Sequence, residues 1–124
     1  MNNYSYVSWK INEVVDLSDQ EEQFAMLPEV LEDDVVNLFK AIANKARIKI
    51  LYVLQQKPLT VTEISEAVGM SQSAISHHLK DLKMARLVTN HKEGRKVIYQ
   101  LDDEHVHEIF DMAVEHVKEI YNYE

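Results

Sequence analysis

Apolar residues recur every three or four positions over most of the chain, which predicts a mainly helical protein. After a proline, the apolar residues Val30, Leu31, Val35, Leu38, Phe39 and Ile42 keep this spacing. Asn44 interrupts the pattern, and a second apolar stripe continues until about Gln56, just before another proline. The spacing therefore predicts one helix over about 28–43 and a second helix between Asn44 and Gln56.

Two further helices follow at short intervals. Thr60-Val61-Thr62-Glu63 has the form of a capping box, which predicts a short helix that stops at Gly69. The next helix is expected from about Ser71 to Met84. Its buried stripe is Ile75, Leu79 and Leu82, and its outward polar residues are Gln72, Ser73, Ser76, His77 and Lys80.

The apolar period changes from helical to strand-like beyond this helix. Residues 87–91 and 97–101 read as short strands, and Gly94 lies in the segment 92–96 that joins them. A short helix, a turn, a second helix and a basic hairpin are the parts of a winged helix-turn-helix. In that fold one helix enters the major groove of DNA, and the hairpin contacts the backbone or the minor groove. We therefore expect a mainly α fold with a small β-hairpin.

Length and composition limit the chain to one compact domain. Its 124 residues, with 46% hydrophobic content, are enough for a single core. We expect residues 28–124 to form this domain and residues 1–27 to form an N-terminal arm, partly helical or flexible, with a capping box at 18–21. No apolar run has the length of a membrane span, and MNNYSYVSWK lacks the pattern of a signal peptide. We therefore expect a cytoplasmic protein without membrane contact.

Charge is distributed unevenly along the chain. Residues 1–39 hold one basic residue and nine acids, for a net charge of -8, and residues 99–124 hold one basic residue and eight acids, for -7. Residues 40–98 hold eleven Lys and Arg against four acids, for +7. This basic segment contains the predicted helix-turn-helix and hairpin, so it could face phosphates. An unevenly charged but merely solvated surface is the alternative.

Candidate DNA contacts follow from this arrangement. Small polar side chains at the start of a helix in the groove can reach base edges or phosphates. Cations on a hairpin can bind phosphates, or can simply keep an edge hairpin soluble. We predict DNA contacts from Ser71, Gln72, Ser73, Ser76, His77, Lys80 and Lys83 in the helix and from Lys92, Arg95 and Lys96 in the hairpin. His78 is expected to pack or hydrogen-bond within its helix, and Arg47 to pair with an acid of the preceding helix.

The segments LFKAIANKARIKILYVL, SQSAISHHLKDLKMARLV and KEGRKVIYQL follow one another over most of residues 24–121. In this order they resemble the signature stretches of the ArsR/SmtB family of bacterial metal-responsive repressors. The chain departs from the family pattern at Ala85-Arg86, where the family often has Ala-Gly. The resemblance implies a homodimeric winged-helix repressor of double-stranded operator DNA that dimerises through its terminal helices.

The last predicted helix begins near Asp103 and carries potential metal ligands on one face. At about 100° per residue, His105, His116 and Glu119 point in nearly the same direction. His105 and His116 are about 16 Å apart along the axis, so one helix alone cannot close a site around a metal ion. In an antiparallel pair of identical helices, facing positions have residue numbers with a constant sum. Asp103 then meets Glu119 and His105 meets His116, so the four side chains converge between two subunits.

These side chains form a donor set that favours zinc. Asp103 and His105 of one chain with His116 and Glu119 of the other supply two oxygen and two nitrogen donors, and symmetry gives two sites per dimer. The pattern also resembles the last-helix metal site of the zinc sensors in this family. Co(II) can substitute for Zn(II), and the absence of cysteine disfavours arsenite, lead and copper(I). His107, about 200° round the helix from His105, is expected to face solvent.

The sequence therefore predicts a repressor that binds its operator as a metal-free homodimer. Zn(II) between the two C-terminal helices would release it, and by resemblance this would derepress genes for metal efflux or sequestration. A winged-helix repressor that responds to nickel, to cobalt or to no metal is the alternative. A zinc hydrolase is disfavoured, because four protein ligands leave no open coordination position and the chain shows no nucleophile motif or phosphate loop. We expect no enzymatic activity and no small organic substrate.

Overall fold

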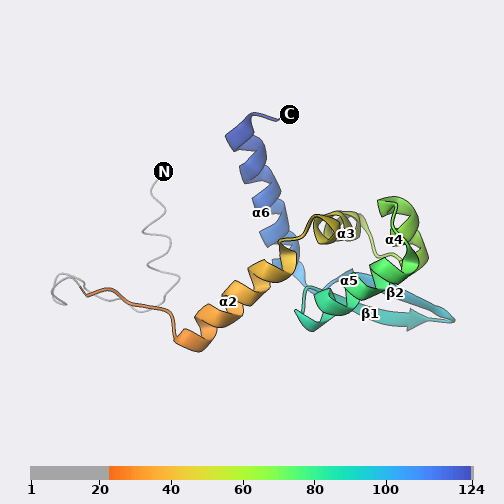
Figure 1. Ribbon diagram of the computed structural model, residues 1–124, viewed down its shortest axis with the longest axis horizontal. Coiled ribbons are helices and arrows are strands. Elements are labelled where there is room, and N and C mark those ends of the chain that lie inside the picture. Colours follow the sequence, from red (N-terminus) through yellow and green to blue (C-terminus); the bar gives the residue numbers. More distant parts are fainter. Residues whose placement is uncertain (1–22, 124) are drawn as a thin grey trace. The chain divides into compact units, whose positions relative to one another are not determined.

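The computed structural model describes residues 23–123. Its elements are α2 (Glu29–Ile42), α3 (Lys45–Gln56), α4 (Val61–Val68), α5 (Gln72–Met84), the strands β1 (Val88–Glu93) and β2 (Lys96–Leu101), and α6 (Glu104–Tyr121), as Figure 1 shows. The predicted mainly α fold with a small hairpin is confirmed. The capping box predicted at residues 18–21 lies outside the described residues.

Local capping interactions explain where the helices begin and end. The Asn44 side chain accepts a hydrogen bond from the Arg47 N–H and starts α3. At the start of α4, Thr60 and Glu63 each accept a hydrogen bond from the other's backbone N–H, at 3.1 and 2.8 Å. Gly69 takes a left-handed conformation, with φ of 81°, and ends α4. The helix-turn-helix predicted from the sequence is therefore fixed by local chemistry.

A single apolar core holds α3, α4, α5, α6 and the hairpin together. α5 packs against α3, α4 and β1 through side chains that are completely buried. The buried residues of this core include Ile50, Leu51, Leu54, Ile64, Ile75, Leu79, Leu82, Leu87 and Val88. The hairpin is also joined to the α3–α4 loop, because Leu59 and Tyr99 exchange two backbone hydrogen bonds at 2.9 and 2.7 Å. α5 and the hairpin therefore share one scaffold.

The hairpin is longer and its turn tighter than predicted. The expected loop of residues 92–96 was wrong, because the strands pair as far as Glu93 and Lys96 and leave only Gly94 and Arg95 in the turn. Gly94 has a φ of 66°, and a positive φ at the first position of the turn is what such two-residue hairpin turns require. The basic side chains of this region are therefore carried on paired strands and a tight turn.

α6 is amphipathic and keeps part of its apolar surface exposed. Val106 and Phe110 are buried in the core, whereas Ile109, Met112, Val117 and Ile120 are exposed in this single chain. No helix within residues 23–123 is long and apolar enough to cross a membrane.

Arg86, the departure from the family pattern, adopts a strained backbone conformation. Its φ is 63°, in the left-handed region that costs a residue with a Cβ about 1–2 kcal/mol. Its guanidinium is exposed and reaches Asp102 only at 4.0 Å, so this ion pair adds little.

Replacing Arg86 by Gly should therefore stabilise the protein. Relief of strain exceeds the added flexibility of the unfolded chain, so the free energy of unfolding should rise by about 0.5–1 kcal/mol. Urea denaturation followed by circular dichroism measures it. Arg86→Ala is the matched control, because it removes the same side chain and keeps the strain. Equal stability of the Gly and Ala variants would contradict this explanation.

Candidate nucleic-acid interface and metal-ligand residues

The N-terminal half of α5 presents the small polar side chains predicted to contact DNA. Ser71 is the N-cap, and its Oγ accepts a hydrogen bond from the Ala74 N–H at 3.1 Å. Gln72, Ser73 and Ser76 are exposed. Because the Ser71 hydroxyl is used only as an acceptor here, its proton remains able to donate to a phosphate oxygen. The start of α5 therefore combines exposed hydrogen-bonding groups with the positive end of a helix dipole.

The basic side chains farther along α5 are also exposed. Lys80 extends from the same helix surface region, and His77 lies 3.9 Å from the carboxylate of Asp81. Lys83 instead donates a hydrogen bond to the side-chain oxygen of Asn90 in β1, at 3.2 Å. Lys83 is therefore drawn toward the hairpin, and Lys80 is the freer cation for a phosphate.

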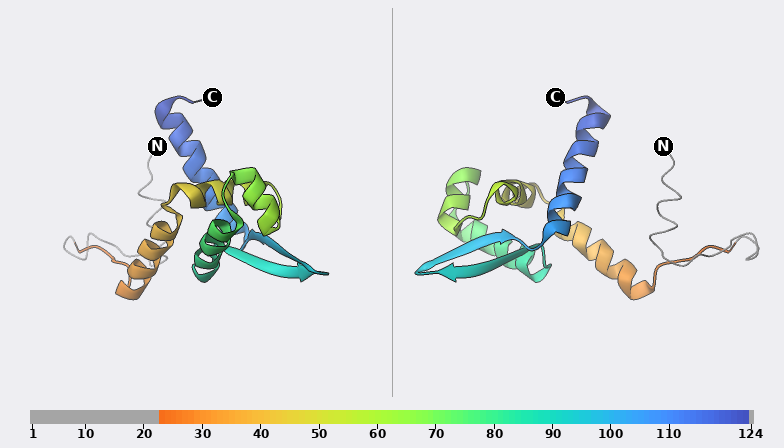
Figure 2. Two further views of the ribbon diagram at one scale, coloured as in Figure 1. Left: turned by 45° about the vertical axis from the view of Figure 1, so that its right-hand side comes forward. Right: turned by 180° about the vertical axis from the view of Figure 1, so that it is seen from behind.

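The hairpin carries the remaining predicted DNA contacts. Lys92, Arg95 and Lys96 are all exposed, and they cluster where the two strands meet at the turn. Figure 2 shows that this end of the hairpin projects beyond the helices in both views. The nearby acid Glu93 has its Oε2 within hydrogen-bond distance of His91 Nε2 on its own strand, at 2.8 Å. The hairpin end therefore offers cations at a projecting edge, as phosphate contact requires.

Arg47 pairs with a different helix from the one predicted. Its guanidinium pairs with Asp81 of α5, with 2.6 Å between Nη2 and Oδ2, and not with an acid of the preceding helix. It also donates to His78 Nδ1 at 3.2 Å and to the carbonyl oxygen of Ala41 at 3.3 Å. His78 thus bonds to α3 and not within its own helix. The sequence pattern could not reveal these contacts, because the bonded positions are 31 and 34 residues apart.

The protonation of His78 suits this contact. Burial lowers the pKa of His78 below its usual value, and the positive charges of Arg47 and His77 lower it further against the opposing effect of Asp81. A neutral imidazole is needed here, because Nδ1 must keep its lone pair to accept from the guanidinium.

Asp103 and His105 lie together at the start of α6. Asp103 is the N-cap, where its side chain accepts from the Val106 N–H, and its other oxygen is 3.5 Å from His105 Nδ1. Partial desolvation alone would raise the pKa of Asp103, but the hydrogen bonds from Val106 and His105 outweigh it and lower the pKa below its ordinary value. Asp103 is therefore ionised near neutral pH, and the His105 side chain remains 83% exposed.

His116 and Glu119 lie on the later turns of α6 and are exposed. A separation of eleven residues places His116 about 16 Å along the helix from His105. Within residues 23–123, no three His, Asp or Glu side chains of one chain are close enough together to hold a metal ion. A single chain therefore presents the predicted ligands as two separate pairs.

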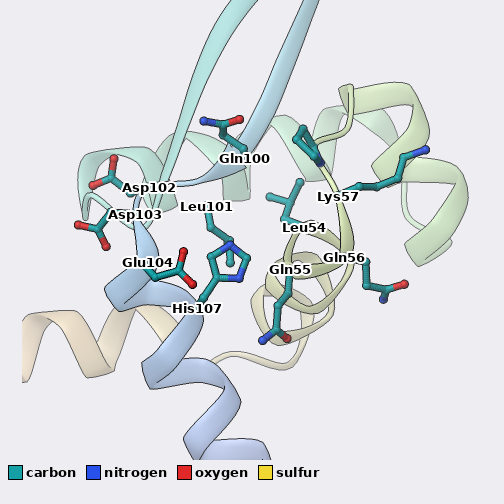
Figure 3. A pocket seen from close by; sticks show the side chains of 11 residues that line it. Leu54, Gln55, Gln56, Lys57, Gln100, Leu101, Asp102, Asp103, Glu104 and His107 are labelled. Atoms are coloured by element: carbon teal, nitrogen blue, oxygen red, sulfur yellow. The ribbon is translucent and has the colours of Figure 1, made fainter.

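His107 does not face open solvent as predicted. It is half-buried and lines a surface pocket of about 400 Å³ between the end of α3 and the start of α6. Figure 3 shows its ring beside Leu101 and Glu104, on the side of α6 that faces Gln55. The prediction from helical spacing that His107 and His105 point in different directions was correct. The packing of α3 against that face could not be read from helical periodicity.

Comparison with known proteins identifies the family. Residues 44–90 match the model of the arsR family of bacterial regulatory proteins. The chain is 39% identical over 88 residues to a cadmium resistance transcriptional regulatory protein CadC homolog of Staphylococcus aureus, covering 70% of this chain and 73% of the relative. It is 32% identical to a transcriptional repressor SmtB homolog of Synechocystis, covering 87% of this chain and 89% of the relative.

A solved structure supports the same assignment. The homodimeric winged helix-turn-helix DNA-binding domain of a possible ArsR-family regulator from Mycobacterium bovis matches with a TM-score of 0.68 and 32% identity, covering 77% of this chain and 95% of that one. The winged helix-turn-helix fold and the family resemblance are therefore both confirmed. This chain belongs to the arsR family of bacterial regulatory proteins, and it is a DNA-binding transcriptional regulator and not an enzyme.

Proposed function

We propose that this protein is a zinc-responsive repressor. In the metal-free state, a homodimer binds double-stranded operator DNA through α5 and the hairpin. Zn(II), bound by Asp103 and His105 of one chain and by His116 and Glu119 of the other, favours release. The observation that carries this proposal is that one regulator chain combines an exposed polar surface at the start of α5 with two separated pairs of carboxylate and imidazole side chains on α6.

The exposed surface of α5 and the hairpin supports the DNA-binding part. Polar side chains at the start of α5 can read base edges in the major groove, and Lys80 can bind a phosphate. Arg95 and Lys96 at the end of the hairpin supply further phosphate contacts. The overall charge of -8 does not oppose this, because the acids are concentrated in the two terminal segments.

Arg95→Gln should weaken DNA binding equally for all sequences. Loss of one phosphate contact should lower affinity several-fold and reduce the slope of log affinity against log salt by about 0.9. Fluorescence anisotropy at several salt concentrations measures both quantities. Lys57→Gln, which removes an exposed charge at the end of α3, should leave the slope unchanged. An unchanged slope in Arg95→Gln would show that the hairpin end does not contact phosphate.

Exposed apolar surface supports the homodimer. A groove of about 350 Å³ is lined almost entirely by apolar side chains of α2, α3 and α6, among them Phe39, Ile48, Ile109 and Val117. On α6, Met112 remains 72% exposed. Contiguous apolar surface of this kind marks an interaction site, and the matched Mycobacterium bovis domain is homodimeric. We infer that a second copy of the chain covers it.

The chemistry of the four α6 side chains supports zinc as the ligand. The carboxylates of Asp103 and Glu119 and the imidazoles of His105 and His116 make a four-donor set of oxygen and nitrogen, which zinc accepts. The lowered pKa of Asp103 keeps its carboxylate available at neutral pH. A complete set requires two chains, because one chain holds only separate pairs. Co(II) would fit the same donors, whereas Ni(II) prefers more ligands.

The experiment for this function measures DNA affinity with and without zinc. A duplex selected from a random library by the purified metal-free protein serves as the probe. We expect zinc to weaken binding at least tenfold, which corresponds to about 1.4 kcal/mol of coupling, and DNA to weaken zinc binding by the same factor. Tight DNA binding that ignores zinc but responds to Ni(II) would favour the alternative of a nickel-responsive repressor. Failure to select any duplex would overturn the DNA-binding proposal itself.

A further inference from the structure

The Arg47 side chain joins three helices at once. Its three guanidinium nitrogens contact the Ala41 carbonyl at the end of α2, His78 Nδ1 and Asp81 Oδ2 on α5, while its backbone belongs to α3. The side chain is only 17% exposed, so water competes weakly for these bonds. Among the side chains of residues 23–123, only that of Arg47 hydrogen-bonds to two other helices.

This network restricts the rotation of α5 about its own axis, which the apolar core leaves open. Ile75, Leu79 and Leu82 hold α5 against the core, but apolar contact is not directional and permits small rotations about the helix axis. His78 and Asp81 are three residues apart and lie along one flank of α5, between its buried stripe and its exposed face. Two directional bonds on that flank set the angle at which the exposed face meets a groove.

We propose that Arg47 is a positioning residue for operator binding: it orients the recognition helix α5 relative to α2 without touching DNA. This inference rests on the proposed DNA-binding function. The link to α2 matters because Phe39, on the same helix as Ala41, lines the apolar groove that we assign to the second subunit. Arg47 therefore connects the side of the domain that faces the partner to the helix that faces the operator.

The decisive variant is Arg47→Lys. Lysine keeps the positive charge and can still pair with Asp81, but a single ammonium cannot reproduce the planar fork that reaches three acceptors. We expect operator affinity to fall about tenfold to hundredfold, with an unchanged salt slope because no phosphate contact is lost. Lys49→Met, which removes an exposed charge from the same helix, should bind like wild type. Wild-type affinity in a folded Arg47→Lys would overturn the proposal, and so would a salt slope reduced by about 0.9, because that indicates direct phosphate contact.

Two further measurements separate orientation from stability. In wild type, long-range nitrogen NMR should show His78 as the neutral tautomer with its proton on Nε2, because Nδ1 accepts from Arg47. This signature should be lost in Arg47→Lys and kept in Lys49→Met. Arg47→Met alone leaves the Asp81 charge unpaired and should lower the stability of the protein. The double variant Arg47→Met/Asp81→Leu leaves no unpaired charge, so it should recover this stability but not the operator affinity. If its affinity also recovers, Arg47 acts only on stability and the proposal fails. If wild type itself selects no duplex, the proposed function fails instead, whereas the NMR signature remains measurable.

Discussion

His116→Ala is expected to bind DNA normally and to lose its response to zinc. Removing one of four ligands should weaken zinc binding by more than about 100-fold, since changing even an outer partner of a ligand costs about 10- to 100-fold. His116 is exposed on α6 and is not part of the buried core, so fold and operator affinity should be unchanged. Zinc titration against a competing chelator measures the loss of zinc affinity. Operator binding at a zinc concentration that saturates the wild-type protein measures the loss of the zinc response.

The matched control for this variant is His107→Ala. His107 lies on the same helix but points into the pocket beside α3. It is therefore not on the ligand face, the exposed side of α6 that carries the proposed zinc ligands. Zinc affinity and the zinc response should both be retained. If His107→Ala abolishes tight zinc binding while His116→Ala does not, the assignment of the ligand face on α6 is wrong.

Leu79→Ala should have the largest effect on stability. Leu79 is fully buried where α5 packs into the core, and truncating such a leucine leaves a cavity that costs about 2–5 kcal/mol. The free energy of unfolding should fall by that amount, measured by urea denaturation at one fixed protein concentration because the protein is expected to dimerise. Operator affinity should fall as well, because the recognition helix loses its support.

Met84→Ala tests whether burial is the cause. Met84 lies on the same helix and loses a side chain of similar size, but it is 74% exposed. Its substitution should change the free energy of unfolding by no more than about 0.5 kcal/mol. Similar losses in the two variants would show that α5 is sensitive to helix composition and not to the core contact.

Elements whose ends are set by neighbouring residues could be predicted from the sequence. The Thr60 capping box and the left-handed Gly69 define α4 within one short segment, and the structure shows both. The hairpin turn was placed less well, because Lys92, Glu93 and Lys96 are all charged and exposed, so no apolar alternation marks where pairing stops. Strand ends that carry no buried side chain give no pattern to read.

Contacts between distant segments were not predictable in the same way. Arg47 has acids available on several helices, and only the packing of α3 beside α5 selects Asp81. His107 was correctly turned away from His105, but its pocket exists because α3 ends beside it. For the proposed metal ligands, helical geometry indicates which side chains share a face of α6 and that one helix cannot use them alone. The proposed convergence of these side chains requires a second chain, which the fold of a single chain does not supply.

The most direct test of the central claim is a complementation experiment between two defective chains. One chain carries Asp103→Ala and His105→Ala, the other carries His116→Ala and Glu119→Ala, and the heterodimer is isolated through two different affinity tags. An inter-subunit site predicts that neither homodimer binds zinc tightly, whereas the heterodimer regains one tight site, because it combines one intact half-set from each chain. Zinc uptake against a competing chelator measures this. A heterodimer that binds zinc no better than the two homodimers would contradict the account.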